Sequence, residues 1–231
     1  MTTNQLARLV CTAVAVLFLF VSSAAGSATW VMSGGLAAYD GGGQVLAYGV
    51  QANSYLYPKQ TSQDDDWVNS LYARQDDGDF FEAGWYWASG ATRRTWFSKL
   101  RRNGISYGET WFPVSDQAAG GWPTIQIRRS GTSGDTYLVY VAGVLRTTEY
   151  STGMTSCRAS VGAERFDTLD YNKGSWTYIK YLSGSNVWAY WPNALHYVGG
   201  AGMVPSDSGF PFWSNHIDHY DHHVYCDDHQ N

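Results

Sequence analysis

Two glutamates stand in surroundings that do not suit a solvated charge. Glu82 lies inside the run Phe80–Trp87, in which aromatic residues occupy both sets of alternating positions. Glu164 ends a second run, Arg158–Glu164, whose nearest members are small rather than polar. A carboxylate in an apolar strand is costly unless it is paired or used, and a carboxyl group held in such a place suits general acid–base chemistry. The plainer alternative is that each glutamate lies on the solvated face of its strand.

The segments leading to Glu82 follow one another in a characteristic order: Tyr48 to Asn53, Tyr57-Pro58, Asp66 to Tyr72 and Phe81-Glu82-Ala83-Gly84-Trp85. This order resembles the opening of the catalytic domain of the neprosin family, with its Gly-x-x-Ala strand, proline, apolar strand and Glu-Ala-Gly-Trp motif. Further along, Val161 to Glu164 is similar to the segment that holds the family's second glutamate. The resemblance covers roughly residues 43–167 and is greatest to short secreted bacterial members.

The resemblance implies a fold of the glutamic-peptidase type and a catalytic pair, Glu82 and Glu164. That fold is a two-sheet antiparallel sandwich of the concanavalin type, with two carboxyl groups on its concave sheet. Two adjacent carboxyl groups cannot both ionise cheaply, so the pair shares one proton over an acidic range. The ionised member takes a proton from the attacking water, and the other stabilises the oxyanion or protonates the leaving nitrogen. The implied function is acid-favoured hydrolysis of a polypeptide substrate, with no cofactor and no metal.

Two other functions fit the same residues. Paired acids on a sandwich face lined by Trp and Tyr also serve β-sandwich glycosidases. A secreted binding module without catalysis is the second alternative, because a fold does not imply a function. For a catalytic role, Trp85, Trp87 and Trp111 are the candidate substrate-binding residues, although large aromatic residues of β proteins more often belong to the core.

The elements that must position these residues are strands. Runs of six to ten residues rich in β-branched and aromatic types alternate with clusters of Gly, Asn, Asp and Ser, which favours an antiparallel sandwich or barrel. Together with the resemblance, the pattern predicts an all-β, two-sheet antiparallel β-sandwich. Tight turns that need a positive φ are expected at Gln75 to Gly78, Arg102 to Gly104, Ser130 to Gly134 and Ala142-Gly143. The predicted strands are Val45–Tyr57, Asp66–Arg74, Phe80–Trp87, Thr95–Arg101, Ser106–Phe112, Thr124–Arg129, Tyr137–Ala142, Val144–Tyr150, Arg158–Glu164, Ser175–Tyr181 and Val187–Trp191.

Composition limits the remaining classes of function. The 231 residues are 44% hydrophobic and 15% charged, which suffices for one sizeable core and excludes a disordered chain. The formal net charge of −5 provides no positive surface for a phosphate backbone, so we expect no nucleic-acid partner. One domain over residues 29–200, acting as a monomer, is the expected organisation.

The first 28 residues have the layout of a secretory signal peptide. Arg8 precedes the apolar run Leu9 to Val21, and small residues follow from Ser22 to Ala28. The alternative is a membrane anchor, but the apolar run is shorter than the roughly 20 residues that span a bilayer. We therefore predict a secreted, extracellular protein with no membrane attachment after cleavage.

Two cysteines, Cys157 and Cys226, remain after removal of the signal peptide. In an exported chain they predict one disulfide, with two free buried thiols as the alternative. Residues 201–231 form a predicted C-terminal extension that ends in a tail rich in His and Asp. Such residues can bind zinc or copper, but their spacing matches no closed tetrahedral motif, so a solvated polar tail is the expectation.

Overall fold

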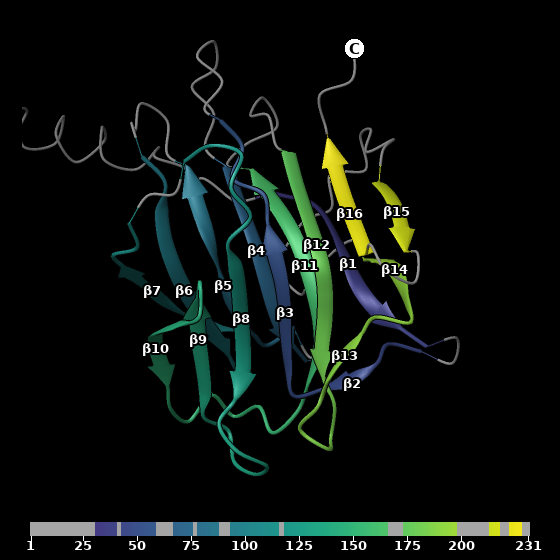
Figure 1. Ribbon diagram of the computed structural model, residues 1–231. Coiled ribbons are helices and arrows are strands. Elements are labelled where there is room, and N and C mark those ends of the chain that lie inside the picture. Colours follow the sequence, from purple (N-terminus) through teal and green to yellow (C-terminus); the bar gives the residue numbers. More distant parts are fainter. Residues whose placement is uncertain are drawn as a thin grey trace, which may run out of the picture.

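The structure is a computed structural model, and it describes residues 31–227 except 41–42, 59–66, 76–77, 88–92, 116–117, 166–172, 198–212 and 218–221. The predicted signal peptide, residues 1–28, lies outside the described residues, as does the end of the His- and Asp-rich tail. Every regular element in the described part is a strand (Figure 1). No helix long and apolar enough to cross a membrane occurs among these residues.

The strands of the described residues build two antiparallel sheets, which lie one over the other in the view of Figure 1. Their bounds are β1 Val31–Tyr39, β2 Leu46–Ala47, β3 Gly49–Ser54, β4 Trp67–Arg74, β5 Phe80–Trp87, β6 Thr95–Arg102, β7 Ile105–Phe112, β8 Thr124–Arg129, β9 Tyr137–Val141, β10 Val144–Glu149, β11 Cys157–Arg165, β12 Lys173–Leu182, β13 Trp188–Tyr190, β14 Asn193–Tyr197, β15 Trp213–Ile217 and β16 His222–Asp227.

Sheet A has the strand order β14-β1-β11-β4-β5-β6-β7, and β2 also pairs with β11. Sheet B has the order β10-β9-β8-β3-β12-β16-β15, and β13 also pairs with β12. The predicted all-β, two-sheet antiparallel sandwich is therefore confirmed. The two predicted glutamates belong to β5 and β11, which are separated in sheet A by β4 alone.

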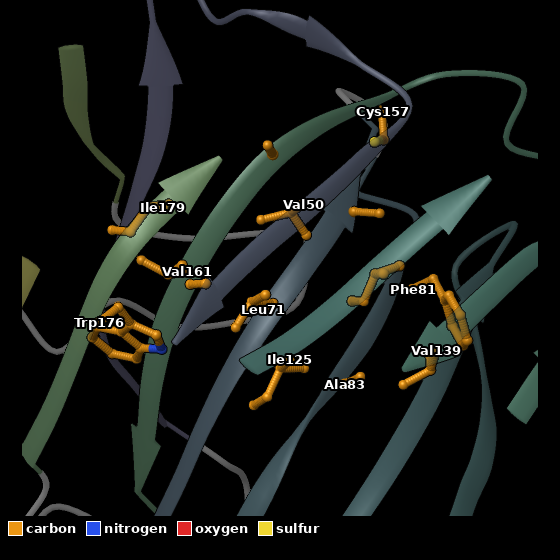
Figure 2. Close-up of a cluster of buried hydrophobic side chains, with 14 of the residues drawn as sticks. Val50, Leu71, Phe81, Ala83, Ile125, Val139, Cys157, Val161, Trp176 and Ile179 are labelled. Carbon is orange, nitrogen blue, oxygen red and sulfur yellow. The ribbon is translucent and has the colours of Figure 1, made fainter. Parts of the chain in front are cut away.

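The core lies between the two sheets, and the alternation of side chains along each strand explains its membership. In β8 the buried positions are every second residue, as expected for a strand with one face on a core. Figure 2 shows side chains of sheet A, among them Leu71, Phe81 and Val161, close to side chains of sheet B, among them Ile125 and Val139. Burial of each such side chain contributes about 1.5–3 kcal/mol.

The predicted strand Val45–Tyr57 is divided at Tyr48. Before this residue β2 pairs with β11 of sheet A, and after it β3 belongs to sheet B. The backbone of Tyr48 is already held by sheet B, because its N–H donates to Leu182 and its carbonyl accepts from Arg129, each at 2.8 Å. The chain therefore changes sheets within one predicted strand, which the pattern of residue types does not reveal.

The predicted tight turns have the expected backbone. Gly78, Asn103 and Gly104 have φ values of 89°, 53° and 72°. Asn103 and Gly104 form the turn that joins β6 to β7. The buried carboxylate of Asp79 stabilises this hairpin, since it accepts hydrogen bonds from the N–H groups of Asn103 at 2.7 Å and Gly104 at 3.2 Å. Ala142 occupies a similar turn between β9 and β10 with a φ of 50°.

Four strands have no counterpart among the predicted ones: β1, β14, β15 and β16. The first contains Ser33-Gly34-Gly35 and Ala37-Ala38, and such small residues give no alternation of apolar and polar positions. The last two come from residues 201–231, which the sequence presents as an extension. In the structure β16 pairs with β12 and thus belongs to sheet B.

The predicted Cys157–Cys226 disulfide is not present, because Cys157 is a free and buried thiol. The register of the strands explains why. Cys157 pairs with Ala47, and the residue after Ala47 is hydrogen-bonded to Leu182 at the end of β12. Cys226 pairs with Gly174 near the start of β12. The length of β12 between these points is about 26 Å, whereas the Cα atoms of a disulfide lie within about 7 Å.

Candidate active site

Glu82 lies on the outer face of sheet A, which we define as the face turned away from sheet B. Its neighbours Phe81 and Ala83 point into the core, so alternation places Glu82 on the opposite side. Although this face is not covered by sheet B, Glu82 is only 2% exposed. A carboxyl group that is this buried outside the core is a candidate for a catalytic or binding role, because it is not solvated like an ordinary surface glutamate. The alternative of a glutamate on a solvated face is wrong for this residue.

Charged residues follow Glu82 across the neighbouring strands. Lys99 of β6 lies directly opposite Glu82, and Glu109 of β7 lies directly opposite Lys99. Lys99 Nζ is 3.1 Å from Glu109 Oε1, and both side chains are partly exposed. On the other side of Glu82, the buried Tyr72 of β4 occupies the same row. The outer face thus carries a row of acid, base and acid that begins at the buried glutamate.

A β-bulge directs the end of β7 toward this row. Lys99 pairs with Glu109 while the adjacent Leu100 pairs with Tyr107, so Gly108 is an extra residue without a partner. An extra residue shifts the following side chains by one position and so moves them to the other face. Because of the bulge, Glu109 and Trp111 share the outer face with Glu82.

A hollow with a volume of about 150 Å³ adjoins these residues on the outer face. Glu82, Lys99 and Glu109 form its polar part. The rest is lined by one aliphatic and three aromatic side chains, Val68, Tyr86, Phe97 and Trp111. The Trp111 ring centre is 5.6 Å from that of Phe97 and 5.9 Å from that of Tyr86. A mostly apolar hollow with a few converging polar groups is the usual form of a ligand site.

The backbone of Glu164 lies on β11, two strands away from β5. Glu164 pairs with Val68, and Val68 pairs with Tyr86, so these three residues form one row across the sheet. The row of Glu82 is four residues away along the strands and includes Ser160 of β11. Strand spacing and rise together put the two glutamate Cα atoms about 16 Å apart. Two of the residues in or beside the row of Glu164, Val68 and Tyr86, line the same hollow as Glu82.

The row between the two glutamates consists of Gly162, Ser70 and Gly84. Gly84 belongs to the Glu-Ala-Gly-Trp motif. The close approach of β4 to β5 at this position explains why the residue is a glycine. A Cβ atom at this position would lie 2.2 Å from the Asn69 carbonyl oxygen and 2.5 Å from Ser70 Oγ. The two glutamate rows are therefore separated by a strip of small residues.

The predicted substrate-binding tryptophans divide between the two faces. Trp85 and Trp87 belong to the core between the sheets, and Trp85 Nε1 donates to Ser54 Oγ of sheet B at 3.0 Å. Their assignment to the substrate is wrong, because they lie on the face of β5 opposite to Glu82. Trp111 lines the hollow and is 49% exposed.

Lys99 and Glu109 are absent from the residues that the sequence singled out. Both stand in ordinary alternating runs, and their meeting depends on the bulge. Gly108 inside the predicted strand is the one sequence signal, since an isolated glycine in a strand often marks a bulge. Among the residues that the structure describes, no group of three or more His, Cys, Asp or Glu side chains could hold a metal ion.

Comparisons with known proteins agree with the fold. No protein-family model and no curated protein matches the sequence. A crystal structure of Scytalido-glutamic peptidase with a transition-state-analogue inhibitor matches 87% of this chain and 98% of that chain, with a TM-score of 0.55 and 10% identity. The same peptidase with a peptide-based analogue gives 0.54 and 9% over the same shares. A β-glucanase from Bacillus licheniformis matches 55% of this chain and 56% of that chain, with a TM-score of 0.41 and 14% identity.

The first two comparisons define the class of fold as a two-sheet β-sandwich like that of a glutamic peptidase. At about one identical residue in ten, they establish the fold alone. Membership of the neprosin family stays a prediction from the sequence.

Proposed function

We propose that this chain is a secreted hydrolase of peptide bonds, with Glu82 and Glu164 as its acid–base pair. One observation carries the proposal most directly. Glu82 is buried on a face that no second sheet covers, at the wall of a hollow lined with aromatic side chains. The fold and the position of the motif agree with such a role, since a glutamic peptidase is among the solved structures with a similar fold.

The reaction follows from the chemistry of two carboxyl groups at acidic pH. The ionised glutamate removes a proton from a water molecule, and the water oxygen attacks the carbonyl carbon of the scissile bond. The protonated glutamate hydrogen-bonds the oxyanion and then gives its proton to the leaving nitrogen. Since one of the pair must be protonated, activity falls as the pH rises toward neutrality.

The hollow provides the means to hold the substrate. Its aromatic end receives an apolar side chain of an extended polypeptide, with Trp111 as the exposed contact. Lys99 and Glu109 at its polar end are within reach of the substrate backbone, whose N–H and C=O groups need partners when they leave water. Specificity then comes from the side chain that enters the hollow.

The test is a cleavage assay on an unfolded polypeptide from about pH 3 to pH 7, a range that spans the ordinary pKa of glutamate. New N-termini identified by mass spectrometry should appear at the acidic end. Glu82→Gln should remove them while leaving the unfolding temperature unchanged, because an amide of the same shape cannot exchange the proton. Release of reducing ends from a panel of polysaccharides, with no peptide products, would instead identify a glycosidase.

A further inference from the structure

The two glutamates of the proposed pair stand in rows of different charge across sheet A. Lys99 of β6 lies directly opposite Glu82, and the Cβ atoms of such a cross-strand pair are about 4.5–5.5 Å apart. The residues that the register puts in the row of Glu164 are uncharged: Met32, Val68, Tyr86 and Thr95. A positive charge therefore accompanies one glutamate and apolar or neutral side chains accompany the other.

The ammonium group of Lys99 is held at the hollow and not in open solvent. Lys99 Nζ is 3.1 Å from Glu109 Oε1, and the Lys99 side chain is 23% exposed. Both residues line the hollow together with Glu82. Because the ion pair is partly buried, salt screens its charges less than those on the open surface. The positive charge thus stays beside the space that the Glu82 carboxyl group adjoins.

Two effects act in opposite directions on the charge of Glu82. Glu82 is 2% exposed, and burial favours the protonated form of a carboxyl group. A positive charge within about 4–6 Å favours the ionised form. A carboxylate this buried is stable only beside such a charge, and Lys99 supplies it. Two acids whose surroundings separate their affinities for a proton take the roles of base and acid.

The other groups around Glu82 leave the balance of charge positive among the described residues. On β4 its opposite neighbour is Tyr72, whose phenol is uncharged at acidic pH. Two acids are near, Glu109 beyond Lys99 and Asp79 in the turn before β5. The next row toward the start of β5 adds three cations: Arg74, Arg101 and Arg158. Lys99 is the cation that shares the hollow with Glu82.

We propose that Lys99 keeps Glu82 ionised and so makes Glu82 the proton acceptor of the pair, an inference that rests on the proposed function. Glu82 takes a proton from the water molecule whose oxygen bonds to the carbonyl carbon. Glu164 gives its proton to the nitrogen as the C–N bond breaks. The pair ends with its one proton on Glu82, and exchange with solvent restores the starting state. Lys99 acts through Glu82 and is a positioning residue.

The test is the pH profile of kcat/KM for Lys99→Met between about pH 2 and pH 7, a range that spans the ordinary pKa of glutamate. The acidic limb of this profile reports the ionisation of the base, and the alkaline limb that of the acid. Without the lysine, Glu82 loses its proton only at a higher pH. The acidic limb should therefore move up by about one pH unit or more, and the alkaline limb should move less. Lys99→Arg keeps the charge and should return the acidic limb toward its wild-type position.

Two further variants make the test specific to this charge. Glu109→Gln should move the acidic limb to lower pH, because it removes a negative charge near Glu82 and frees Lys99 from a competing carboxylate. Lys180→Met is the matched control, since it removes a half-buried lysine of sheet B whose Nζ lies 4.6 Å from the centre of the Tyr190 ring. Neither limb should move in this variant.

A shift of the alkaline limb in Lys99→Met would make Glu82 the acid and overturn the assignment. A profile equal to that of the wild type, or loss of cleavage at every pH in a folded variant, overturns it as well. In each case an inactive Glu82→Gln leaves the proposed function standing. If Lys99→Met does not fold, Lys99→Gln removes the same charge and gives the same measurement. A wild-type chain that cleaves no peptide overturns both proposals.

Discussion

Trp111 keeps about half of its surface exposed although it contacts two other rings. Phe97 and Tyr86 fix its orientation, so the exposed part of the indole is a rigid surface for an apolar side chain. This arrangement costs little further conformational entropy on binding. The residue therefore suits the substrate contact proposed above better than a role in the core.

Trp111→Ala should raise KM about tenfold for a peptide with an aromatic residue near the scissile bond and leave kcat nearly unchanged. Loss of one aromatic contact removes about 0.5–1.5 kcal/mol beyond the lost area. The matched control is Trp122→Ala, which removes another partly exposed tryptophan that contacts the Tyr55 ring and does not line the hollow. Equal effects of the two variants on KM would contradict a binding role for Trp111.

The buried thiol of Cys157 leads to a separate prediction, about the pH dependence of the stability of the fold. Burial raises the pKa of the Cys157 thiol to about 12, although the neighbouring Tyr137 and Arg129 lower it in part. The thiol of the unfolded chain ionises near pH 8.5, so the unfolded state loses its proton first as the pH rises. The contribution to stability is complete below about pH 8.5 and is lost as the pH approaches 12.

The measurement is the free energy of unfolding of the wild type and of Cys157→Ala between about pH 7 and pH 10.5, a window that spans the ordinary thiol pKa. Stability of the wild type should fall more steeply with pH than that of the variant. Parallel curves would show that Cys157 ionises equally in both states. Burial, the largest cause of the raised pKa of Tyr137, acts in both proteins, whereas the smaller effect of Cys157 on that pKa is lost in the variant.

At the scale of elements, β5 shows what the sequence can predict about a strand and what it cannot. Its bounds, Phe80–Trp87, are as predicted, because a run rich in aromatic residues ends at turn residues on either side. Its faces were not predictable. Aromatic residues occupy both sets of alternating positions in β5. The residue types alone therefore do not show that Trp85 lies in the core and Tyr86 at the hollow.

The bulge in β7 is a second limit. The sequence predicts the strand, but the partners of Glu109 and Trp111 depend on the single extra residue Gly108. The sequence did not predict the small-residue strand β1 or the change of sheet at Tyr48, for a related reason. Each is decided by pairing with distant strands and not by local residue types. The position of Glu82 at the site, in contrast, followed from its motif.

Gly84→Ala tests the contact between β4 and β5. The added Cβ would lie 2.2 Å from the backbone oxygen of Asn69, and a backbone atom cannot move aside as a flexible side chain does. We expect a loss of about 1–3 kcal/mol in the free energy of unfolding, measured by denaturant titration. Gly108→Ala is the control, because no atom lies within 4 Å of a Cβ there, and its stability should stay within about 0.5 kcal/mol of the wild type. Equal stability of the two variants would contradict the close approach at Gly84.

At the scale of the whole molecule, the sandwich separates stability from chemistry. The faces turned toward each other hold the core, while the outer face of sheet A carries Glu82, the hollow and the strip of small residues. We therefore expect substitutions on the outer face to change the proposed activity without loss of the core. The strand order also brings segments far apart in sequence into one region of sheet A, since β11 and β5 are separated by β4 alone.

The central claim is that Glu82 and Glu164 act as one unit on one water molecule. Residues that act as a unit lose their effect together, so a second substitution adds little once the first has been made. The decisive measurement is kcat/KM for peptide cleavage at acidic pH in the wild type, Glu82→Gln, Glu164→Gln and the double variant. We predict that each single variant loses nearly all activity and that the double variant is no worse than either. Near-normal cleavage by one of the single variants, or losses that simply multiply in the double variant, would contradict the claim.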